Sequence, residues 1–232
     1  MHDRQRSVSP GWPVTGRYRC LLIVILMLGA LALAGCEKPA ASPPVTLAAP
    51  HSILPALIWL TADLGYFDEQ GLNLKLQTYP SGKRALAALM RGEAELAATA
   101  ETPFVIASFK RDDLRLYATL GQSDNEVSIL ARRDHGITAP PDLRGKTVAT
   151  QEGSAIHFFL TSFLLFHRIS ETDINIRFMK VEDLAPALVN GDIDAVSIRE
   201  PYRTRIRKQL GDDRLVDFHA RGLYTKTYNL VG

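Results

Sequence analysis

The sequence predicts an α/β protein with two lobes and a cleft between them. Three observations support this prediction: one stretch of sequence occurs twice, short apolar strands alternate with helical segments, and the chain begins like a secreted protein. Strands that alternate with helices are typical of parallel sheets covered by helices. Two copies of such a unit, with their sheet edges facing each other, would form a cleft between two lobes.

The repeated stretch covers residues 89–101 and 188–200. In each copy a leucine is followed by a glycine, two acidic residues at alternate positions and a final glutamate, and a proline and an aromatic residue come next. Glycine adopts the left-handed conformation that ends a helix, and proline favours the start of the next one. Each copy therefore predicts a helix, a turn, a strand and a second helix that begins at the proline. The alternative is chance similarity in an alanine-rich α/β protein.

The residues between the strand and the second helix of each copy are candidates for a binding site, because ligands of open α/β sheets bind at the carboxyl ends of the strands. They include Thr99 and Glu101 in the first copy and Arg199 and Glu200 in the second. Two glutamates in one cleft favour an amine or amidine and oppose a bare anion, unless Arg199 offsets them. Alternatively, Glu200 only complements the dipole of the helix that follows it.

The composition is that of an ordinary globular protein, with 232 residues, 46% of them hydrophobic and 22% charged. This length suffices for one large or two small domains. The formal net charge of +2 comes from the leader, where residues 1–35 contain four arginines and one aspartate. The charge pattern therefore gives no indication of nucleic-acid binding. Cys20 and Cys36 both lie in the leader region, so we expect neither a disulfide nor a thiol site in the folded part.

An apolar run of 14 residues, from Leu21 to Ala34, follows a basic start. It is shorter than the roughly 20 residues that cross a bilayer and fits a secretion signal. The sequence at 33–36 resembles the bacterial lipoprotein signal, which implies that residues 1–35 are a signal peptide and that Cys36 becomes lipidated. An uncleaved anchor helix or an ordinary signal peptide is the alternative. Residues 36–44, rich in alanine, proline and serine, are predicted to be a flexible tether.

The first folded elements are predicted from their apolar spacing. Residues 45–49 form a short apolar strand, and leucines at helical spacing predict a helix over 54–66. Leucines that alternate with polar residues predict a half-buried strand over 72–76. Ser81 is a typical N-cap for a helix over 83–90, whose alanines and leucines form one buried face.

The middle of the chain continues this alternation. After the first repeat we expect a helix over 103–110 and strands over 114–120 and 127–132. A Pro-Pro-Asp break precedes a strand over 147–150. An apolar helix then extends to Phe166, with Ser154 as its cap.

The last part of the chain contains the second repeat. Alternating apolar residues predict a strand over 174–178, and a helix over 182–190 leads into the repeated turn and strand. A basic helix that ends at Leu210 follows. Residues 215–218 are predicted to be extended, and 224–231 to form the final strand.

Several segments, taken in order, resemble the substrate-binding proteins of bacterial ABC importers. The segments are 65–72, 86–92, 142–146 and 191–195, with Glu200-Pro201 after them. The resemblance is greatest to the branch that binds nitrate, sulfonates, taurine and thiamine precursors, and it extends over essentially the whole mature chain. Each motif is loose when taken alone, and their order and spacing together are more specific.

This resemblance implies a periplasmic-binding-protein fold of two α/β lobes, type II-like, with the ligand in the cleft. We expect residues 45–130 in lobe 1, 131–224 in lobe 2, and 225–232 as the start of a strand that returns to lobe 1. Members of the family usually continue well past this point, so the resemblance predicts a fold that is truncated at its C-terminus.

Loops at the strand ends contribute further candidate ligand-binding residues. Ser154 is the strongest, because a hydroxyl and the free N–H groups of a helix start favour an anion. His157 lies one turn further and could donate to the same ligand. His51, Ser52 and Ser81 complete the predicted ring of polar groups. Each has an ordinary alternative as a helix cap or a solvated loop residue.

These features predict an extracytoplasmic solute-binding lipoprotein of an ABC importer. It would be a monomer, anchored to the membrane by lipid in the periplasm or at the cell surface, and it would deliver a small ligand to a membrane permease. The expected ligand is a small polar or anionic solute of the sulfonate, nitrate or taurine type. A thiamine-precursor pyrimidine, or a role in sensing rather than import, is the alternative.

Catalysis has little support in the sequence. The motifs His-Glu-x-x-His and Gly-x-Ser-x-Gly are both absent, and so is a pair of cysteines in the predicted folded part. We therefore predict no cofactor, no metal and no enzymatic activity. An enzyme of this fold, related to pyrimidine synthesis, remains the third possibility.

Overall fold

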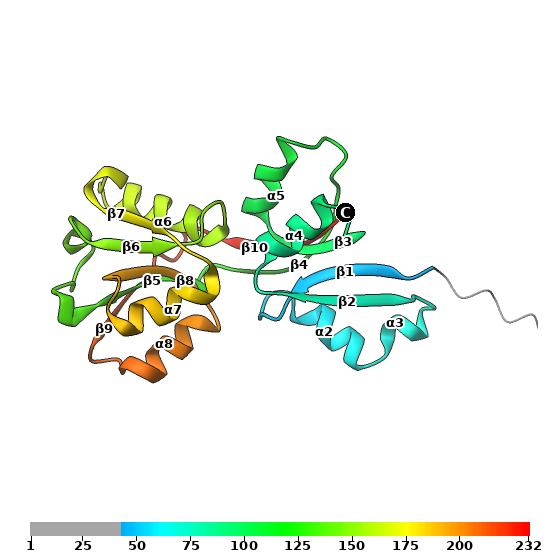
Figure 1. Ribbon diagram of the computed structural model, residues 1–232, viewed down its shortest axis with the longest axis horizontal. Helices are drawn as coiled ribbons and strands as arrows, with labels where there is room; N and C mark the ends of the chain where they lie inside the picture. The colour runs from blue at the N-terminus through cyan, green and yellow to red at the C-terminus, as the bar shows by residue number, and fades with distance from the viewer. Residues whose placement is uncertain (1–42) are drawn as a thin grey trace, which may run out of the picture. The chain divides into compact units, whose positions relative to one another are not determined.

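The computed structural model describes residues 43–232, which form two five-stranded sheets with helices on both faces of each (Figure 1). The predicted signal peptide, the lipidation site Cys36 and most of the predicted tether lie outside the described residues. The alternation of strands and helices confirms the α/β class. None of the helices within residues 43–232 is long and apolar enough to cross a bilayer.

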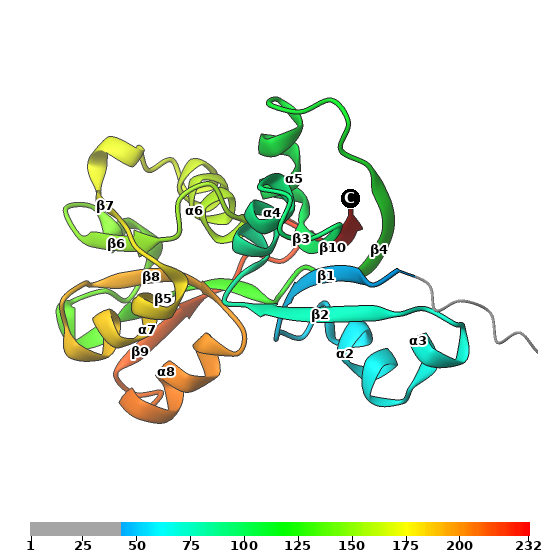
Figure 2. The same ribbon diagram turned by 45° about the vertical axis from the view of Figure 1, so that its right-hand side comes forward.

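The first sheet has the strand order β2-β1-β3-β10-β4. Its strands are β1 (Val45–Pro50), β2 (Leu74–Tyr79), β3 (Leu96–Ala100), β4 (Leu116–Ser123) and β10 (Lys226–Val231). Its helices are α2 (Ala56–Asp63), α3 (Tyr66–Glu69), α4 (Gly82–Met90) and α5 (Glu101–Ser108). Figure 2 shows α4 and α5 on one side of this sheet and α2 and α3 on the other.

The second sheet has the order β7-β6-β8-β5-β9. Its strands are β5 (Val127–Arg132), β6 (Thr147–Thr150), β7 (Asn175–Phe178), β8 (Ala195–Arg199) and β9 (Leu215–Phe218). Its helices are α6 (Ala155–Phe166), α7 (Val181–Asn190) and α8 (Tyr202–Leu210), and the short 3-10 turns are η1 (Arg133–His135), η2 (Pro140–Leu143) and η3 (Glu171–Asp173). In Figure 1, α6 covers one face, and α7 and α8 cover the other.

The repeated sequence supplies the central strand of each sheet. β3 and β8 each pair in parallel with one neighbour, β1 or β6, and antiparallel with the other, β10 or β5. The chain crosses from the first sheet to the second between β4 and β5, and it returns between β9 and β10 (Figure 1). The final strand therefore lies inside the first sheet, where it pairs with β3 and β4.

The second acidic residue of each repeat has the same structural role. The carboxylate of Glu95 accepts a hydrogen bond from the amide of Thr46 at 2.7 Å, and that of Asp194 accepts one from the amide of Thr147 at 2.8 Å. Each acid also donates its own amide to the carbonyl of the same threonine. In each copy these two hydrogen bonds connect the turn before the central strand to the start of the neighbouring parallel strand.

The helix starts after the two repeats differ from the prediction. The glycines end their helices as expected, with φ of 74° at Gly92 and 83° at Gly191. However, α5 already begins at Glu101, so Pro103 stands inside its first turn instead of opening it. In the second copy the proline directly follows the glutamate, Glu200–Pro201 is cis, and α8 begins one residue later.

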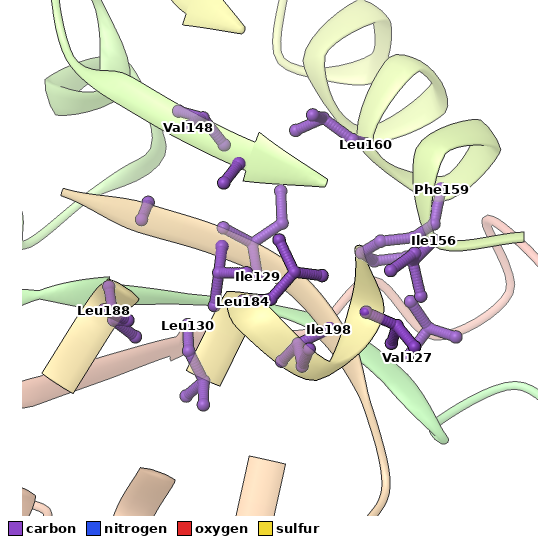
Figure 3. Packing of buried hydrophobic residues seen from close by; sticks show 14 of the residues in the cluster. Val127, Ile129, Leu130, Val148, Ile156, Phe159, Leu160, Leu184, Leu188 and Ile198 are labelled. Atoms are coloured by element: carbon purple, nitrogen blue, oxygen red, sulfur yellow. The ribbon is translucent and has the colours of Figure 1, made fainter. Parts of the chain in front are cut away.

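The core of the second sheet is the more completely enclosed of the two. All six residues of β5 are buried, and its Val127, Ile129 and Leu130 pack between α6 and α7 (Figure 3). In the first sheet, the edge strand β4 is largely exposed, with Leu116 at 47% and Tyr117 at 61%. The apolar side chains of α2 are also mostly exposed, since Ile58 is its one buried residue.

Candidate anion-binding cavity

A small cavity lies where the starts of α4 and α6 and the end of β8 meet strand β10. Its volume is about 30 Å³, which is space for two or three water-sized groups at roughly 10–15 Å³ each. The residues that line it are Ser81, Gly82, Lys83, Ala100, Pro103, Gln151, Ser154, Ala155, Ile156, Arg199, Lys226 and Tyr228. Three of these side chains are cationic, and none is a carboxylate.

Arg199 is the cation that the second repeat places in this cavity. Its side chain lies at the end of β8 and the residue is 7% exposed. The guanidinium donates to the carbonyl oxygens of Glu200 at 2.9 Å and Pro80 at 3.1 Å. Within residues 43–232 it forms no ion pair with a carboxylate. Its positive charge is therefore available to a ligand.

Lys226, the first residue of β10, is the second buried cation of the cavity. The residue is 2% exposed and its ammonium group pairs with the carboxylate of Glu126, which is 5% exposed. Burial is the main cause that lowers the pKa of Lys226, while the charge of Glu126 raises it and that of Arg199 lowers it further. Such a pair costs desolvation energy that its mutual attraction must offset.

The first residues of two helices, α4 and α6, line the cavity. The amides of the first turn of a helix have no partner within the helix, and the helix dipole makes this end partly positive. The hydroxyl of Ser81 caps α4, as predicted, by accepting from the amide of Arg84 at 3.4 Å. Ser154 occupies the N-cap position of α6, but its hydroxyl donates to the carbonyl of Gln151 at 2.5 Å, so the predicted side-chain cap does not form.

Gly82 allows Tyr228 to approach the start of α4. A Cβ atom at position 82 would lie 2.3 Å from the Tyr228 hydroxyl oxygen and 3.0 Å from the Cα of Thr99. Burial is the main cause that raises the pKa of Tyr228, so its hydroxyl stays protonated. The cavity wall therefore contains a neutral donor beside the two buried cations.

Direct contacts join the two sheets beside the cavity. The ammonium of Lys83 donates to the carbonyl of Glu152, and Arg84 forms an ion pair with Glu182 at 3.1 Å. The side chain of Gln151 also donates to the hydroxyl of Ser81 at 3.4 Å. These contacts hold the two sheets together beside the cavity.

Three of the predicted ligand-binding residues, Ser81, Ser154 and Arg199, line the cavity. Thr99 is fully buried beside Gly82, and its hydroxyl has no hydrogen-bond partner in the described part of the chain. The imidazole of His157 accepts from the amide of Gly153 at 3.1 Å. These five residues belong to the same region of the cleft, although only the first three reach the cavity itself.

The remaining predicted residues do not line the cavity. The Glu101 carboxylate accepts from the Tyr224 hydroxyl and from the amide of Thr227 at 2.9 Å. That of Glu200 binds Arg203 at 2.9 Å and the amide of Thr204 at 3.2 Å. His51 stacks on Trp59 with ring centroids 4.1 Å apart, and it lines a separate hollow together with Ser52 and Pro201. The ligand-binding roles of all these residues stay predictions.

Sequence reasoning missed Gln151, Lys226, Tyr228 and the partner Glu126. Lys226 and Tyr228 are two residues apart and therefore lie on the same face of the last predicted strand. A charged residue at the start of a buried strand is unusual and could have indicated a functional site. The place of Lys226 and Tyr228 near the cavity depends on the pairing of β10 with β3 and β4, across more than a hundred residues, which no local pattern indicates.

A family model described as NMT1/THI5 like matches residues 56–228. The chain belongs to the NMT1/THI5-like family. This confirms the resemblance that the ordered motifs indicated.

Relatives of this NMT1/THI5-like chain include a Bacillus subtilis protein named for aliphatic sulfonate binding, 25% identical over 90% of this chain and 65% of the relative. The taurine-binding periplasmic protein of Escherichia coli is 24% identical over 78% of this chain and 55% of its own length. The chain thus spans less than two thirds of these relatives. The alkanesulfonate-binding protein SsuA of Xanthomonas axonopodis pv. citri, solved with MOPS, has a TM-score of 0.72 at 21% identity over 83% of this chain and 66% of that one.

Proposed function

We propose that this protein binds a small oxyanion in the cavity between its two sheets. The observation that carries the proposal is the convergence of two buried cations, Arg199 and Lys226, and two helix starts on one small cavity. Cations and helix N-termini both favour negative charge. The glutamates that would favour an amine, Glu101 and Glu200, are bound to other groups and do not line the space.

The names of the relatives narrow the class of ligand to sulfonates and similar solutes. A sulfonate presents three oxygens on one compact group, which suits a site lined by several cationic and hydroxyl donors. We therefore propose an extracytoplasmic solute-binding component of an ABC importer, with a role in binding and delivery rather than catalysis. Separation and closure of the two sheets would admit the ligand and present the closed form to a membrane permease.

Isothermal titration of the purified full chain tests the proposal. Methanesulfonate, taurine and nitrate should be tried at low salt, and at least one should bind saturably. Replacement of Arg199 by Gln should weaken that binding, whereas replacement of the exposed Arg205 on α8 should not. Failure of all three anions to bind would overturn the proposal.

We propose further that the protein is held outside the cytoplasm by acyl chains on Cys36, as a monomer. The support is the sequence pattern before that cysteine together with the periplasmic relative. The intact mass of the protein purified from membranes should equal that of a diacylated or triacylated chain starting at Cys36. The Cys36→Ser variant should lose this mass and leave the membrane fraction. An unmodified chain that begins elsewhere would contradict the lipid anchor without affecting the binding site.

A further inference from the structure

The buried positive charges around the cavity outnumber the buried negative charges. Two cations, Arg199 and Lys226, and one carboxylate, Glu126, are each at least nine-tenths buried. Lys226 and Glu126 form an ion pair, whereas Arg199 contacts two carbonyl oxygens and the ring of Tyr202 and pairs with no carboxylate within the described residues. Buried charges are screened far less by water and salt than exposed ones. Their sum is therefore felt by any ion that enters the cavity.

Glu126 is placed to control this sum without touching the ligand. It precedes β5, where the chain crosses to the second sheet, and Lys226 opens β10, where the chain has crossed back. One carboxylate oxygen binds Lys226, and the other is buried without a hydrogen-bond partner in the part of the chain described. Its negative charge is thus not spread over other donors, and it is the carboxylate in contact with Lys226.

We propose that Glu126 sets the charge preference of the cavity, because its offset of Lys226 leaves one net buried positive charge and so favours monoanions over dianions. This inference rests on the proposed function, since it concerns the same site. A monoanion completes neutrality among the buried groups. A dianion of the same shape leaves an uncompensated negative charge, which costs energy in a site removed from water.

Two further charged side chains lie near the cavity and do not alter this reasoning. Lys83 lies at the rim, where its ammonium group donates to the carbonyl of Glu152. Glu101 is only partly buried and is bound to Tyr224 and Thr227. Lys83 and Glu101 are the same in the wild type and in a Glu126 variant. Their charges therefore do not change the difference in anion preference between the two proteins.

The experiment compares two tetrahedral ions of similar size and different charge, methanesulfonate and sulfate, by titration of the full chain. The wild type should prefer methanesulfonate. Glu126→Gln keeps the shape of the side chain, raises the buried charge by one, and should shift the ratio of the two Kd values toward sulfate by at least about tenfold. The double variant with Glu126→Gln and Lys226→Met returns the buried charge to that of Arg199 alone, so the ratio should return toward the wild-type value.

Glu93→Gln is the matched control, because Glu93 is an exposed glutamate paired with Arg91 outside the cavity. It should leave the ratio unchanged. Methylphosphonate provides a test that does not depend on a folded variant, since it passes from monoanion to dianion near neutral pH. Its affinity for the wild type should fall across that range relative to methanesulfonate.

The outcomes separate the two proposals. If the wild type binds neither ion nor any other anion, the proposed function itself fails. If the wild type binds anions, but sulfate or dianionic methylphosphonate binds as well as methanesulfonate, the charge inference is overturned. The same follows if folded Glu126→Gln, checked by circular dichroism, retains the wild-type ratio.

Discussion

In the first copy of the repeat, β3 continues directly into α5 at Glu101, whereas in the second, β8 ends at Arg199 and a proline separates it from α8. The residue that corresponds to Arg199 in the first copy is Ala100. Both side chains line the cavity, one as a cation and one as a small apolar wall. Matching backbone positions have thus taken different roles, and the charge at the site comes from the second copy.

The final glutamates of the two copies differ in a similar way. Glu200 binds Arg203 and Thr204, which are close to it in sequence. Glu101 instead binds Tyr224 and Thr227 near the start of β10, so it connects the first repeat to the returning chain. A shared sequence pattern therefore specifies the strand and its turn, while the ends of the pattern adapt to different surroundings.

The largest expected effect on binding comes from replacing Arg199 by alanine, the residue at the matching position of the first copy. Arg199→Ala should weaken binding of methanesulfonate by about 2–5 kcal/mol, because it removes a buried cation that would face the anion. Titration calorimetry measures this loss. Arg205→Ala, on the exposed part of α8, should bind as the wild type does, and equal affinities of all three proteins would contradict the role of Arg199.

A second comparison concerns the two helix starts, where Ser81-Gly82 in one corresponds to Ser154-Ala155 in the other. Gly82→Ala should lower the free energy of unfolding by about 1–3 kcal/mol, because the added methyl group overlaps Tyr228. Urea denaturation gives the value. Gly121→Ala, whose nearest neighbour would be a backbone oxygen at 3.1 Å, is a less severe control. Unchanged stability of Gly82→Ala would show that Tyr228 moves away freely.

The two glutamates should differ in their contribution to stability. Glu101→Gln leaves an amide donor facing the Tyr224 hydroxyl or the Thr227 amide, and we expect a cost of about 1–2 kcal/mol. Glu200→Gln disturbs only a local cap and an ion pair within one helix turn, so its cost should be about 0.5–1 kcal/mol. Chemical denaturation of both variants checks the order, and a larger loss for Glu200→Gln would reverse our interpretation.

The smallest expected effect is on how the stability of the protein depends on pH. Burial acts to raise the pKa of Asp194, but the amide of Thr147 and the imidazole of His135 outweigh it and hold the pKa below its usual value. Since the pKa is lower in the folded state, the stabilisation is present at neutral pH and is lost as the pH falls through the folded value. Asp194→Asn should therefore cost about 1 kcal/mol at pH 7 and less near pH 3. A pH-independent difference between the two proteins would contradict this account.

Glu95 serves as the matched position in the first copy. The amide of Thr46 likewise lowers its pKa, but the carboxylate is exposed and has no histidine beside it. Glu95→Gln should consequently show the same direction of pH dependence with a smaller amplitude. Thermal unfolding of both variants between pH 3 and pH 7 compares them directly.

Local patterns in the sequence predicted most of the fold, because strands and helices were marked by apolar spacing and by glycines such as Gly92 and Gly191. Ser81, Ser154 and Arg199, which line the cavity, were predicted by one rule, that ligands bind where parallel strands end, and their role in binding stays a prediction. Lys226 and Tyr228 could not be placed in this way. They reach the cavity on an antiparallel strand from the far end of the chain, and only the pairing of β10 with β3 shows it.

The exposed strand β4 has a practical consequence for anyone who handles the protein. Among the described residues no strand pairs with its outer edge, and the segment from Leu116 to Gln122 contains neither a charge nor a proline. Natural sheets usually protect such edges with these residues. Concentrated samples should therefore associate through β4 before the cavity region is affected, and a lysine in place of Tyr117 should keep them dispersed. Light scattering at increasing concentration would show whether it does.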